Sequence, residues 1–212
     1  MKVLSVKSLA IADVKVLRFA RFVDSRGYFT ETFRKSDLAE DERVSFLRGA
    51  DFVQGNESLS RPGTMRGLHL QWHPHMGKLV RTVRGHMIDL VLDIRKGSPT
   101  QGHLVGYDMP DNPDSVYSEW LWVPPGFAHG NCFPEETQIE YLCTGEYSQG
   151  CEAGISPFAA DIEWTLCDPV LKARVDHLSG QGALVTDKDR HGLSLTKWFA
   201  DERSENFIYG RC

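Results

Sequence analysis

The apolar positions of the chain are gathered in short runs, and each run is bounded by a cluster of glycine, proline, asparagine or aspartate residues. Runs of this length that are rich in β-branched and aromatic residues are typical of β-strands. The runs are Val14–Phe22, Phe52–Ser60, Met65–Trp72, Lys78–Val83, Met87–Ile94, Leu104–Met109, Trp120–Val123 and Ile139–Cys143. Short strands at nearly regular spacing predict an antiparallel sandwich or barrel and disfavour a parallel α/β sheet.

Helical patterns are confined to two short segments. Ser36 is placed to cap a helix that runs to about Leu47, and Ser194 is placed to cap one that runs to about Ala200. The chain has no internal repeat, no low-complexity tract and no stretch with the composition of a linker. We therefore expect a single domain over residues 1–212, all-β with short peripheral helices.

One predicted strand carries polar residues that a plain core strand lacks. In the segment RGLHLQW, Gly67 interrupts the strand, which is typical of a bulge or of a close approach between backbones. Strict alternation places His69 and Gln71 on one face and Arg66 on the other. A bulge at Gly67 would instead bring all three side chains to one cavity. The plainer alternative is a hydrogen-bonded core histidine beside a surface arginine.

Charge and cysteine content narrow the class of protein. The net charge is −5, from 24 Lys+Arg and 29 Asp+Glu, and the chain has no dense basic stripe, so we do not expect nucleic acid as a main partner. No segment approaches the roughly 20 apolar residues of a membrane span, so we expect neither a signal segment nor a membrane contact. The five cysteines include no CxxC pair and are expected to be reduced thiols of a cytoplasmic protein.

A second polar cluster lies near the middle of the chain. The segment VPPGFAHGN places His129 on a tight connection. Together with Gly67 and the turn His73–His75, this cluster resembles the two signature segments of the cupin superfamily, which implies a double-stranded β-helix jelly roll (a cupin barrel). Metal-binding cupins also supply a glutamate in the stretch where this chain has Lys78. Because an ammonium group repels a divalent ion and offers it no lone pair, we expect no metal.

A more specific resemblance covers nearly the whole chain. Successive segments are similar, in order, to the motifs of the dTDP-4-dehydrorhamnose 3,5-epimerase family. The segments are Asp24–Phe33, Phe52–Asn56, Arg66–Gln71, Gly77–Val80, Asp93–Thr100, Pro125–Gly130, the pair Tyr141 and Tyr147 followed by Glu152, and Asp187–Arg190. The resemblance implies a cofactor-independent jelly-roll epimerase that acts on nucleotide-activated 4-keto-6-deoxy sugars, usually as a homodimer.

Four residues of these motifs fit the chemistry of such a reaction. Inversion of a carbon next to a ketone needs a base, a cation or donor at the ketone oxygen, and an acid across the ring. His69 suits the base, because an imidazole is largely unprotonated near pH 7. The resemblance implies that Asp189 orients His69, that Lys78 stabilises the O4 oxyanion, and that Tyr141 is the acid. Taken singly, Lys78 could be a solvated strand-end lysine, Tyr141 a core aromatic, and Asp189 part of an exposed charged turn.

The same resemblance implies the remaining contacts to the substrate. The residues that match positions holding the sugar and the diphosphate are Arg66, His129 and Lys188. Arginine suits phosphate oxygens because of its planar fork of donors. The residues that match a segment reaching the nucleotide, often from the neighbouring subunit, are Arg26, Phe29 and Glu31. Further polar contacts match Gln54, Asn56 and Glu152, and the ring that stacks on the nucleobase matches Tyr147.

Three stretches depart from the family pattern. The spacing from His69 to Lys78 is one residue shorter than expected, and the stretches Asp108–Glu119 and Cys167–Gly182 are longer. These departures leave open which nucleotide (dTDP, CDP or GDP) is bound, and whether C3, C5 or both are inverted. Two other classes of function also remain: a nucleotide-sugar ketoisomerase of the same barrel, and a cupin that either depends on a metal or only binds sugar.

Overall fold

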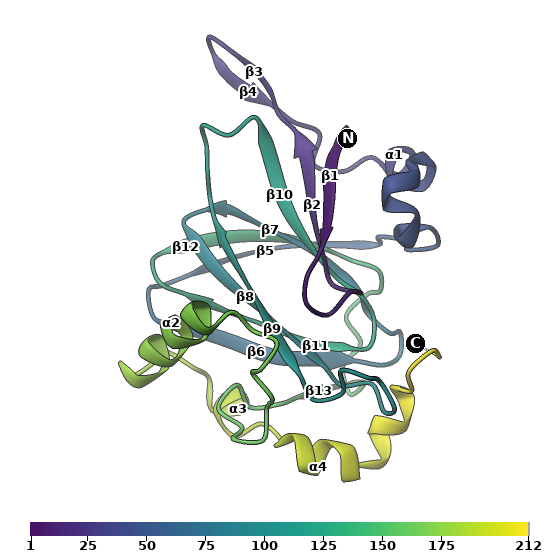
Figure 1. The fold of residues 1–212 in the computed structure, drawn as a ribbon, viewed down its shortest axis with the longest axis vertical. Coiled ribbons are helices and arrows are strands. Elements are labelled where there is room, and N and C mark those ends of the chain that lie inside the picture. The colour runs from purple at the N-terminus through teal and green to yellow at the C-terminus, as the bar shows by residue number, and fades with distance from the viewer. Residues whose placement is uncertain (212) are drawn as a thin grey trace.

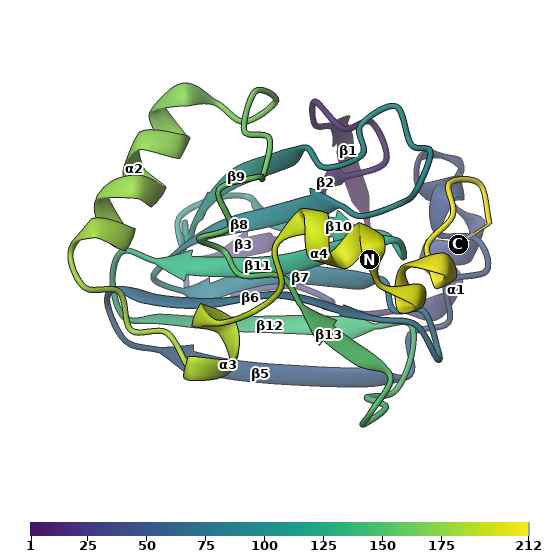
Figure 2. The same cartoon turned by 90° about the horizontal axis from the view of Figure 1, so that it is seen from below.

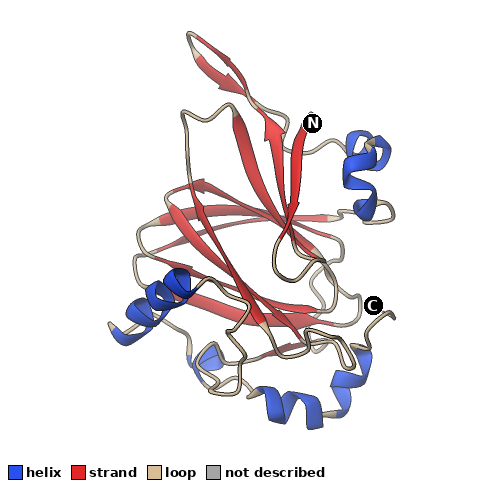
Figure 3. Cartoon of the chain, in the orientation of Figure 1, coloured by secondary structure: helices blue, strands red, loops and turns tan. Residues whose placement is uncertain are grey.

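The computed structural model describes residues 1–211, whose main elements are the strands of two antiparallel sheets (Figures 1 and 3). The six-stranded sheet has the order β1-β2-β10-β7-β12-β5, and the five-stranded sheet has the order β13-β6-β11-β8-β9. Strands β3 and β4 form a separate hairpin. The strands are β1 Val3–Ser8, β2 Lys15–Ala20, β3 Phe22–Asp24, β4 Gly27–Phe29, β5 Gln54–Ser60, β6 Thr64–Gln71, β7 Lys78–Arg84, β8 His86–Asp93, β9 Leu104–Pro110, β10 Tyr117–Val123, β11 Phe127–Phe133, β12 Thr137–Cys143 and β13 Glu152–Gly154.

The two sheets face each other and enclose the inner apolar core of a jelly-roll barrel. This core draws on both sheets, with Val80 and Ile139 from β7 and β12 packed against Val91 and Phe133 from β8 and β11. Burial of such side chains contributes roughly 1.5–3 kcal/mol each to the free energy of folding. The all-β cupin-type jelly roll expected from the sequence is confirmed.

The side chains of strand β8 are buried on both faces of its sheet, in two different apolar clusters. All its residues except His86 are buried. Successive side chains of a strand point to opposite faces, and Met87 and Val91 accordingly enter the inner core, whereas Ile88 and Leu90 join the cluster on the outer face. The same alternation directs Asp89, between them, into the barrel.

Helices cover the outer faces of the sheets. The helical elements are α1 Lys35–Glu40, the 3₁₀ helix η1 Glu42–Leu47, α2 Pro169–Gly180, α3 Asp187–Arg190, α4 Leu195–Ala200 and the 3₁₀ helix η2 Glu202–Asn206. Leu171 of α2 and Trp198 of α4 pack on the five-stranded sheet. Helices α2, α3 and α4 lie on the lower side of this sheet in Figure 1, and α4 is in front of the strands in Figure 2, which is seen from below. Leu38 of α1 and Val44 of η1 pack on the outer face of the six-stranded sheet.

Several expected boundaries were wrong. The segment around His129 is not a tight connection but strand β11, which pairs with both β6 and β8. The helical segment expected from Ser36 to about Leu47 does end at Leu47, but it begins at Lys35 without a side-chain cap, and its second half is the 3₁₀ helix η1. The sequence pattern did not indicate β1 or α2. By contrast, Ser194 caps α4, since its hydroxyl accepts a hydrogen bond from the backbone N–H of Lys197.

Two further expectations concern cysteines and membrane contact. Cys132, Cys143, Cys151 and Cys167 are free thiols, as expected, and Cys212 lies outside the described residues. Within residues 1–211, no helix has the length and apolar character that crossing a bilayer requires.

Candidate active site

The barrel holds two adjoining cavities, of about 280 and 720 Å³. Four side chains line both of them: His69 from β6, Lys78 from β7, His129 from β11 and Tyr141 from β12. The first cavity extends to Gln54, Asn56, Gln71, Tyr147 and Glu152. The second extends to Ser58, Arg66, Asn131, Leu184, Lys188 and Asp189. The shared side chains therefore form the centre of one elongated site.

A bulge in β6 brings Arg66 and His69 to the same site. On β11, His129 pairs with His69 and Asn131 pairs with Arg66, so two residue steps on β11 face three on β6. The extra residue lies at Gly67, whose φ of +103° favours glycine. The bulge proposed from the sequence is confirmed.

Strand alternation also places the two candidates on the opposite sheet. Cys143 pairs with Lys78, and Tyr141 pairs with Val80, which belongs to the inner core. Lys78 and Tyr141 therefore point into the barrel from neighbouring strands, and Lys78 Nζ lies 6.0 Å from the centre of the Tyr141 ring.

His69 is held by a buried carboxylate. Its Nε2 lies 2.7 Å from Asp189 Oδ1, and the backbone N–H of Gly67 donates to Asp189 Oδ2 at 3.1 Å. The Asp189 side chain is only 6% exposed, whereas that of His69 is 42% exposed. Burial alone would raise the pKa of Asp189, but the hydrogen bonds from His69 and Gly67 outweigh it and lower that pKa. Asp189 thus remains an anionic hydrogen-bond acceptor, while His69 reaches the cavity. The carboxylate of Asp189 is therefore not part of an exposed charged turn.

A second histidine–aspartate pair lies beside the first. His129 Nε2 lies 3.0 and 2.9 Å from the two carboxylate oxygens of Asp89, and Asn131 Nδ2 donates to Asp89 Oδ2 at 3.0 Å. Burial lowers the pKa of His129, although Asp89 opposes the shift. Asp89 was not among the site residues expected from the sequence. The feature that could have indicated it is a lone carboxylate within an apolar strand, MIDLVL.

Lys78 is not a solvated strand-end lysine. Burial lowers the pKa of its ammonium group, and the opposing influences of Cys143 and Asp89 do not cancel the shift. Within residues 1–211 its Nζ makes no hydrogen bond. A cation without a hydrogen-bond acceptor, facing a cavity, is free to bind an oxygen of a ligand.

Tyr141 keeps its proton at neutral pH. Burial raises the pKa of its hydroxyl, and the charge of Arg66 and the Asn56 amide oppose this only in part. Its hydroxyl is therefore a proton donor.

The rim of the first cavity is a connected polar cluster. The hydroxyl of Tyr147 donates to Glu152 Oε1 at 3.0 Å, and Lys188 Nζ donates to the same oxygen at 2.9 Å. Gln54 Oε1 accepts from the backbone N–H of Tyr147 at 2.8 Å, and Gln54 Nε2 donates to Asn56. The Tyr147 side chain stays 57% exposed, which leaves its ring open to a stacking partner.

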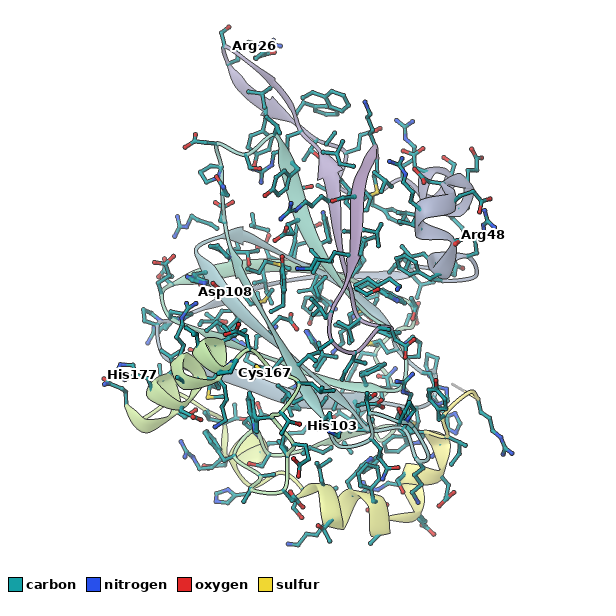
Figure 4. All side chains as sticks on the ribbon, in the orientation of Figure 1. Arg26, Arg48, His103, Asp108, Cys167 and His177 are labelled. Carbon is teal, nitrogen blue, oxygen red and sulfur yellow. The ribbon has the colours of Figure 1, made fainter. Side chains whose placement is uncertain are left out.

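Three expected contacts are not made within one chain. Arg26 lies at the tip of the β3–β4 hairpin, which projects away from both sheets (Figure 4), and it pairs with Asp24. Phe29 is exposed on the same hairpin. Glu31 binds the N-terminal amine and Arg34. None of the three expected residues lines either cavity.

The expected turn histidines form no metal centre. His73 is exposed, and His75 Nε2 lies 2.8 Å from the carbonyl oxygen of Asn206. Across the part of the chain that the structure describes, no three His, Cys, Asp or Glu side chains are grouped so as to hold a metal ion.

Comparison with known proteins places the chain in a family. Residues 8–197 match the family model described as dTDP-4-dehydrorhamnose 3,5-epimerase. The dTDP-4-dehydrorhamnose 3,5-epimerase of Shigella flexneri is 39% identical over 165 residues, 76% of this chain and 87% of that one. The enzyme of the same name from Sinorhizobium fredii is 41% identical over 152 residues, 70% of this chain and 73% of that one.

A solved structure shares the fold. It is that of a dTDP-6-deoxy-D-glucose-3,5-epimerase from Legionella pneumophila in complex with dTDP-4-keto-L-rhamnose. The two chains superpose with a TM-score of 0.77 at 29% identity, over 96% of this chain and 97% of that one. With the two-sheet barrel and its polar site already described, these matches show that the chain is an isomerase of the dTDP-4-dehydrorhamnose 3,5-epimerase family.

Proposed function

We propose that this enzyme inverts C3 and C5 of a dTDP-linked 4-keto-6-deoxy sugar without a cofactor. The observation that carries the proposal is the meeting of the His69–Asp189 pair, Lys78 and Tyr141 around one cavity. His69 belongs to the five-stranded sheet and Tyr141 to the six-stranded sheet, so base and acid stand on opposite walls. Family membership favours an epimerase over the ketoisomerase and the metal-dependent cupin that the sequence left open.

Proton removal is assigned to His69. With Asp189 accepting the proton on Nε2, the lone pair of Nδ1 is free to take the α-proton of the ketone. The electron pair of the broken C–H bond moves to O4 and forms an enolate. The carboxylate of Asp189 stabilises the imidazolium that results, and the exposure of His69 lets it return the proton to solvent.

Lys78 and Tyr141 complete the reaction. The ammonium group of Lys78 stabilises the charge on O4, and partial burial strengthens this attraction because the local dielectric constant is low. Tyr141 then donates its proton to C5 from the face opposite His69, and the phenolate recovers a proton from solvent. C3 is reprotonated by solvent at the cavity. The raised pKa of Tyr141 supports this role, because the hydroxyl enters the reaction protonated.

The nucleotide and diphosphate are assigned to the rim. The exposed ring of Tyr147 stacks on the nucleobase, with Gln54 and Asn56 beside it. Arg66 and Lys188 bind the diphosphate, as guanidinium and ammonium groups commonly do. Lys188 is paired with Glu152 in the free enzyme, so the diphosphate must take the place of the Glu152 carboxylate at the Lys188 ammonium group. We also assign a sugar contact to His129.

A second copy of the chain completes the site in this proposal. The hairpin residues Phe22 and Phe29 are 53% and 64% exposed, which is unusual for neighbouring aromatic side chains and typical of an interface. In a homodimer, the hairpin would carry Arg26 and Phe29 to the nucleotide of the partner, together with Glu31, which follows β4 by two residues. A monomer would then lack part of its site.

The test is incubation with dTDP-4-keto-6-deoxyglucose in heavy water, followed by NMR of the sugar. The proposal predicts deuterium at both C3 and C5 and an L-configured product, without added metal and in the presence of a chelator. Parallel assays with CDP- and GDP-linked 4-keto sugars measure the preference for the nucleotide. Exchange at C3 alone would restrict the enzyme to a single inversion, and exchange at neither carbon would refute the proposal.

A further inference from the structure

Gln71 is a buried polar residue that the proposed reaction does not use. It ends strand β6, is 7% exposed and lines the first cavity. Its Nε2 donates to the carbonyl oxygens of Pro74 and Glu146, both at 3.0 Å, and its Oε1 accepts from the backbone N–H of Ser148 at 2.9 Å. Both N–H groups of this amide are therefore engaged within the protein, and the amide is not free to bind a ligand.

Two of these bonds flank Tyr147. Gln71 holds the residue before it, Glu146, and the residue after it, Ser148. The N–H of Tyr147 itself is held by Gln54 from β5. The segment around Tyr147 belongs to no strand or helix, so side-chain amides from the two sheets replace the backbone ladder that would otherwise fix it.

The position of the Tyr147 ring depends on this support. The ring is mostly exposed, and among residues 1–211 its hydroxyl has Glu152 as its one hydrogen-bond partner. An exposed side chain has few packing contacts of its own, so its place over the cavity is set by the backbone beneath it.

We infer that Gln71 is a positioning residue that holds Tyr147 in place to stack on the base of a nucleoside diphosphate. This inference rests on the proposed function, because it assumes that Tyr147 binds the nucleobase. Gln71 would act before substrate arrives, since a ring that is already in place loses little freedom on binding. Its removal should weaken nucleotide binding and leave the proton-transfer residues unaffected.

Two variants with side chains close to glutamine in volume distinguish the hydrogen bonds that Gln71 donates from the one that it accepts. Gln71→Met removes the polar group. Gln71→Glu, when ionised, still accepts from Ser148 but can no longer donate to Pro74 and Glu146. The matched control is Gln138→Met on β12, because Gln138 lines neither cavity.

The first measurement is the affinity for dTDP by calorimetry, together with KM and kcat for the dTDP-4-keto sugar. We expect both Gln71 variants to raise Kd and KM roughly tenfold, the effect of losing one or two buried hydrogen bonds, with kcat nearly unchanged. Wild-type affinity for dTDP in Gln71→Met would overturn the inference.

A double-mutant cycle tests whether Gln71 affects dTDP binding by positioning Tyr147 or only by stabilising the protein in general. If Gln71 acts through Tyr147, then Gln71→Met should not lower dTDP affinity further in a chain that already carries Tyr147→Ala. If the two losses instead add, Gln71 does not act through the tyrosine and the inference fails.

Amide hydrogen exchange tests the positioning role without relying on nucleotide binding. In Gln71→Met, the amide of Ser148 should exchange faster than in the wild type and in Gln138→Met. Unchanged exchange would overturn the inference even if the protein bound no nucleotide. If the wild type fails to bind dTDP while exchange at Ser148 rises as expected, it is the proposed function that fails, and the positioning of the segment stands.

Discussion

His69 and His129 are partners on neighbouring strands, and each contacts an aspartate, but burial separates their chemistry. The His129 side chain is 7% exposed and its pKa is lowered by burial, so it stays neutral and fixed on Asp89. His69 is open to the cavity and to water. Only His69 can exchange protons with both substrate and solvent, which is why we assign it, and not His129, as the base.

Replacing the candidate acid should separate the two inversions. In Tyr141→Phe, deuterium should still enter C3, because solvent at the cavity can reprotonate that carbon. The yield of C5-inverted product should fall sharply, because no positioned donor remains on that face. NMR of the product in heavy water measures both. An unchanged yield of C5-inverted product would return Tyr141 to the role of a core aromatic.

The lowered pKa of Asp189 gives the stability a dependence on pH. A carboxylate whose pKa is lower in the folded state stabilises the protein above its unfolded pKa of about 3.9, and that contribution is lost as pH falls through the folded value. Asp189→Asn should therefore destabilise the protein at pH 6, by about 2 kcal/mol, and this deficit should shrink below pH 3.9. Urea unfolding at the two pH values measures it. A deficit that is constant with pH would contradict the assignment.

At the scale of elements, β6 and β11 depend on two glycines that face each other. A Cβ built on Gly67 would lie 2.6 Å from the carbonyl oxygen of His129. A Cβ on Gly130 would lie 2.5 Å from the carbonyl oxygen of Arg66. Both contacts are to backbone atoms, so a side chain cannot be accommodated by rotating a neighbour. The close approach of these strands sets the bulge and, with it, the direction of His69.

Gly67→Ala should therefore be far more harmful than an alanine at an unobstructed glycine. Gly63 is the matched control, because it has a φ of +76° but no atom within 4 Å of a built Cβ. Gly63→Ala should cost about 1–2 kcal/mol for the backbone conformation alone, and Gly67→Ala clearly more. Urea denaturation of both variants measures the difference. Equal losses of stability in the two variants would mean that β6 and β11 do not approach each other as closely at Gly67 as described.

The sequence indicated most strands because they are short β-rich runs bounded by turn residues, and the folded chain ends its strands at nearly the same places. Strand β12 is a clear case, since the run Ile139–Cys143 and the strand both end at Cys143. Strand β11 was missed because Gly130 and its neighbour Asn131 are typical of turns. Here the glycine is required by the backbone of β6, a long-range contact that no local pattern contains.

The candidate site was predictable to the extent that the family motifs contain it. Asp89 lies outside those motifs, and its partner His129 is 40 residues away, so the pair becomes visible only when β8 and β11 lie side by side. Helix α2 was missed because only Leu171 and Val175 of its residues are buried, which leaves little amphipathic pattern.

At the scale of the whole molecule, contacts within one chain do not explain what the β3–β4 hairpin is for. It projects from the six-stranded sheet with exposed aromatic residues (Figure 1). Its charged tip lies far from the cavities of its own chain. Association with a second copy would bury the aromatic side chains and give the tip a ligand to contact.

Disruption of the hairpin surface should therefore abolish both dimer and activity. We expect the wild type to sediment as a dimer and Phe29→Asp to sediment as a monomer with greatly reduced epimerase activity. Val170→Asp is the control, because Val170 is 72% exposed on α2, away from the hairpin. A Phe29→Asp protein that remains dimeric and fully active, or a wild type that is monomeric and active, would exclude a shared site.

The central claim is that His69 removes the protons of the sugar. The most direct measurement is deuterium incorporation at C3 and C5 by His69→Asn in heavy water, beside calorimetric affinity for dTDP. Because the base is lost and the binding contacts remain, exchange at both carbons should fall by about 10²–10⁴-fold, while dTDP affinity stays close to that of the wild type. Exchange near the wild-type rate at either carbon would show that another group is the base.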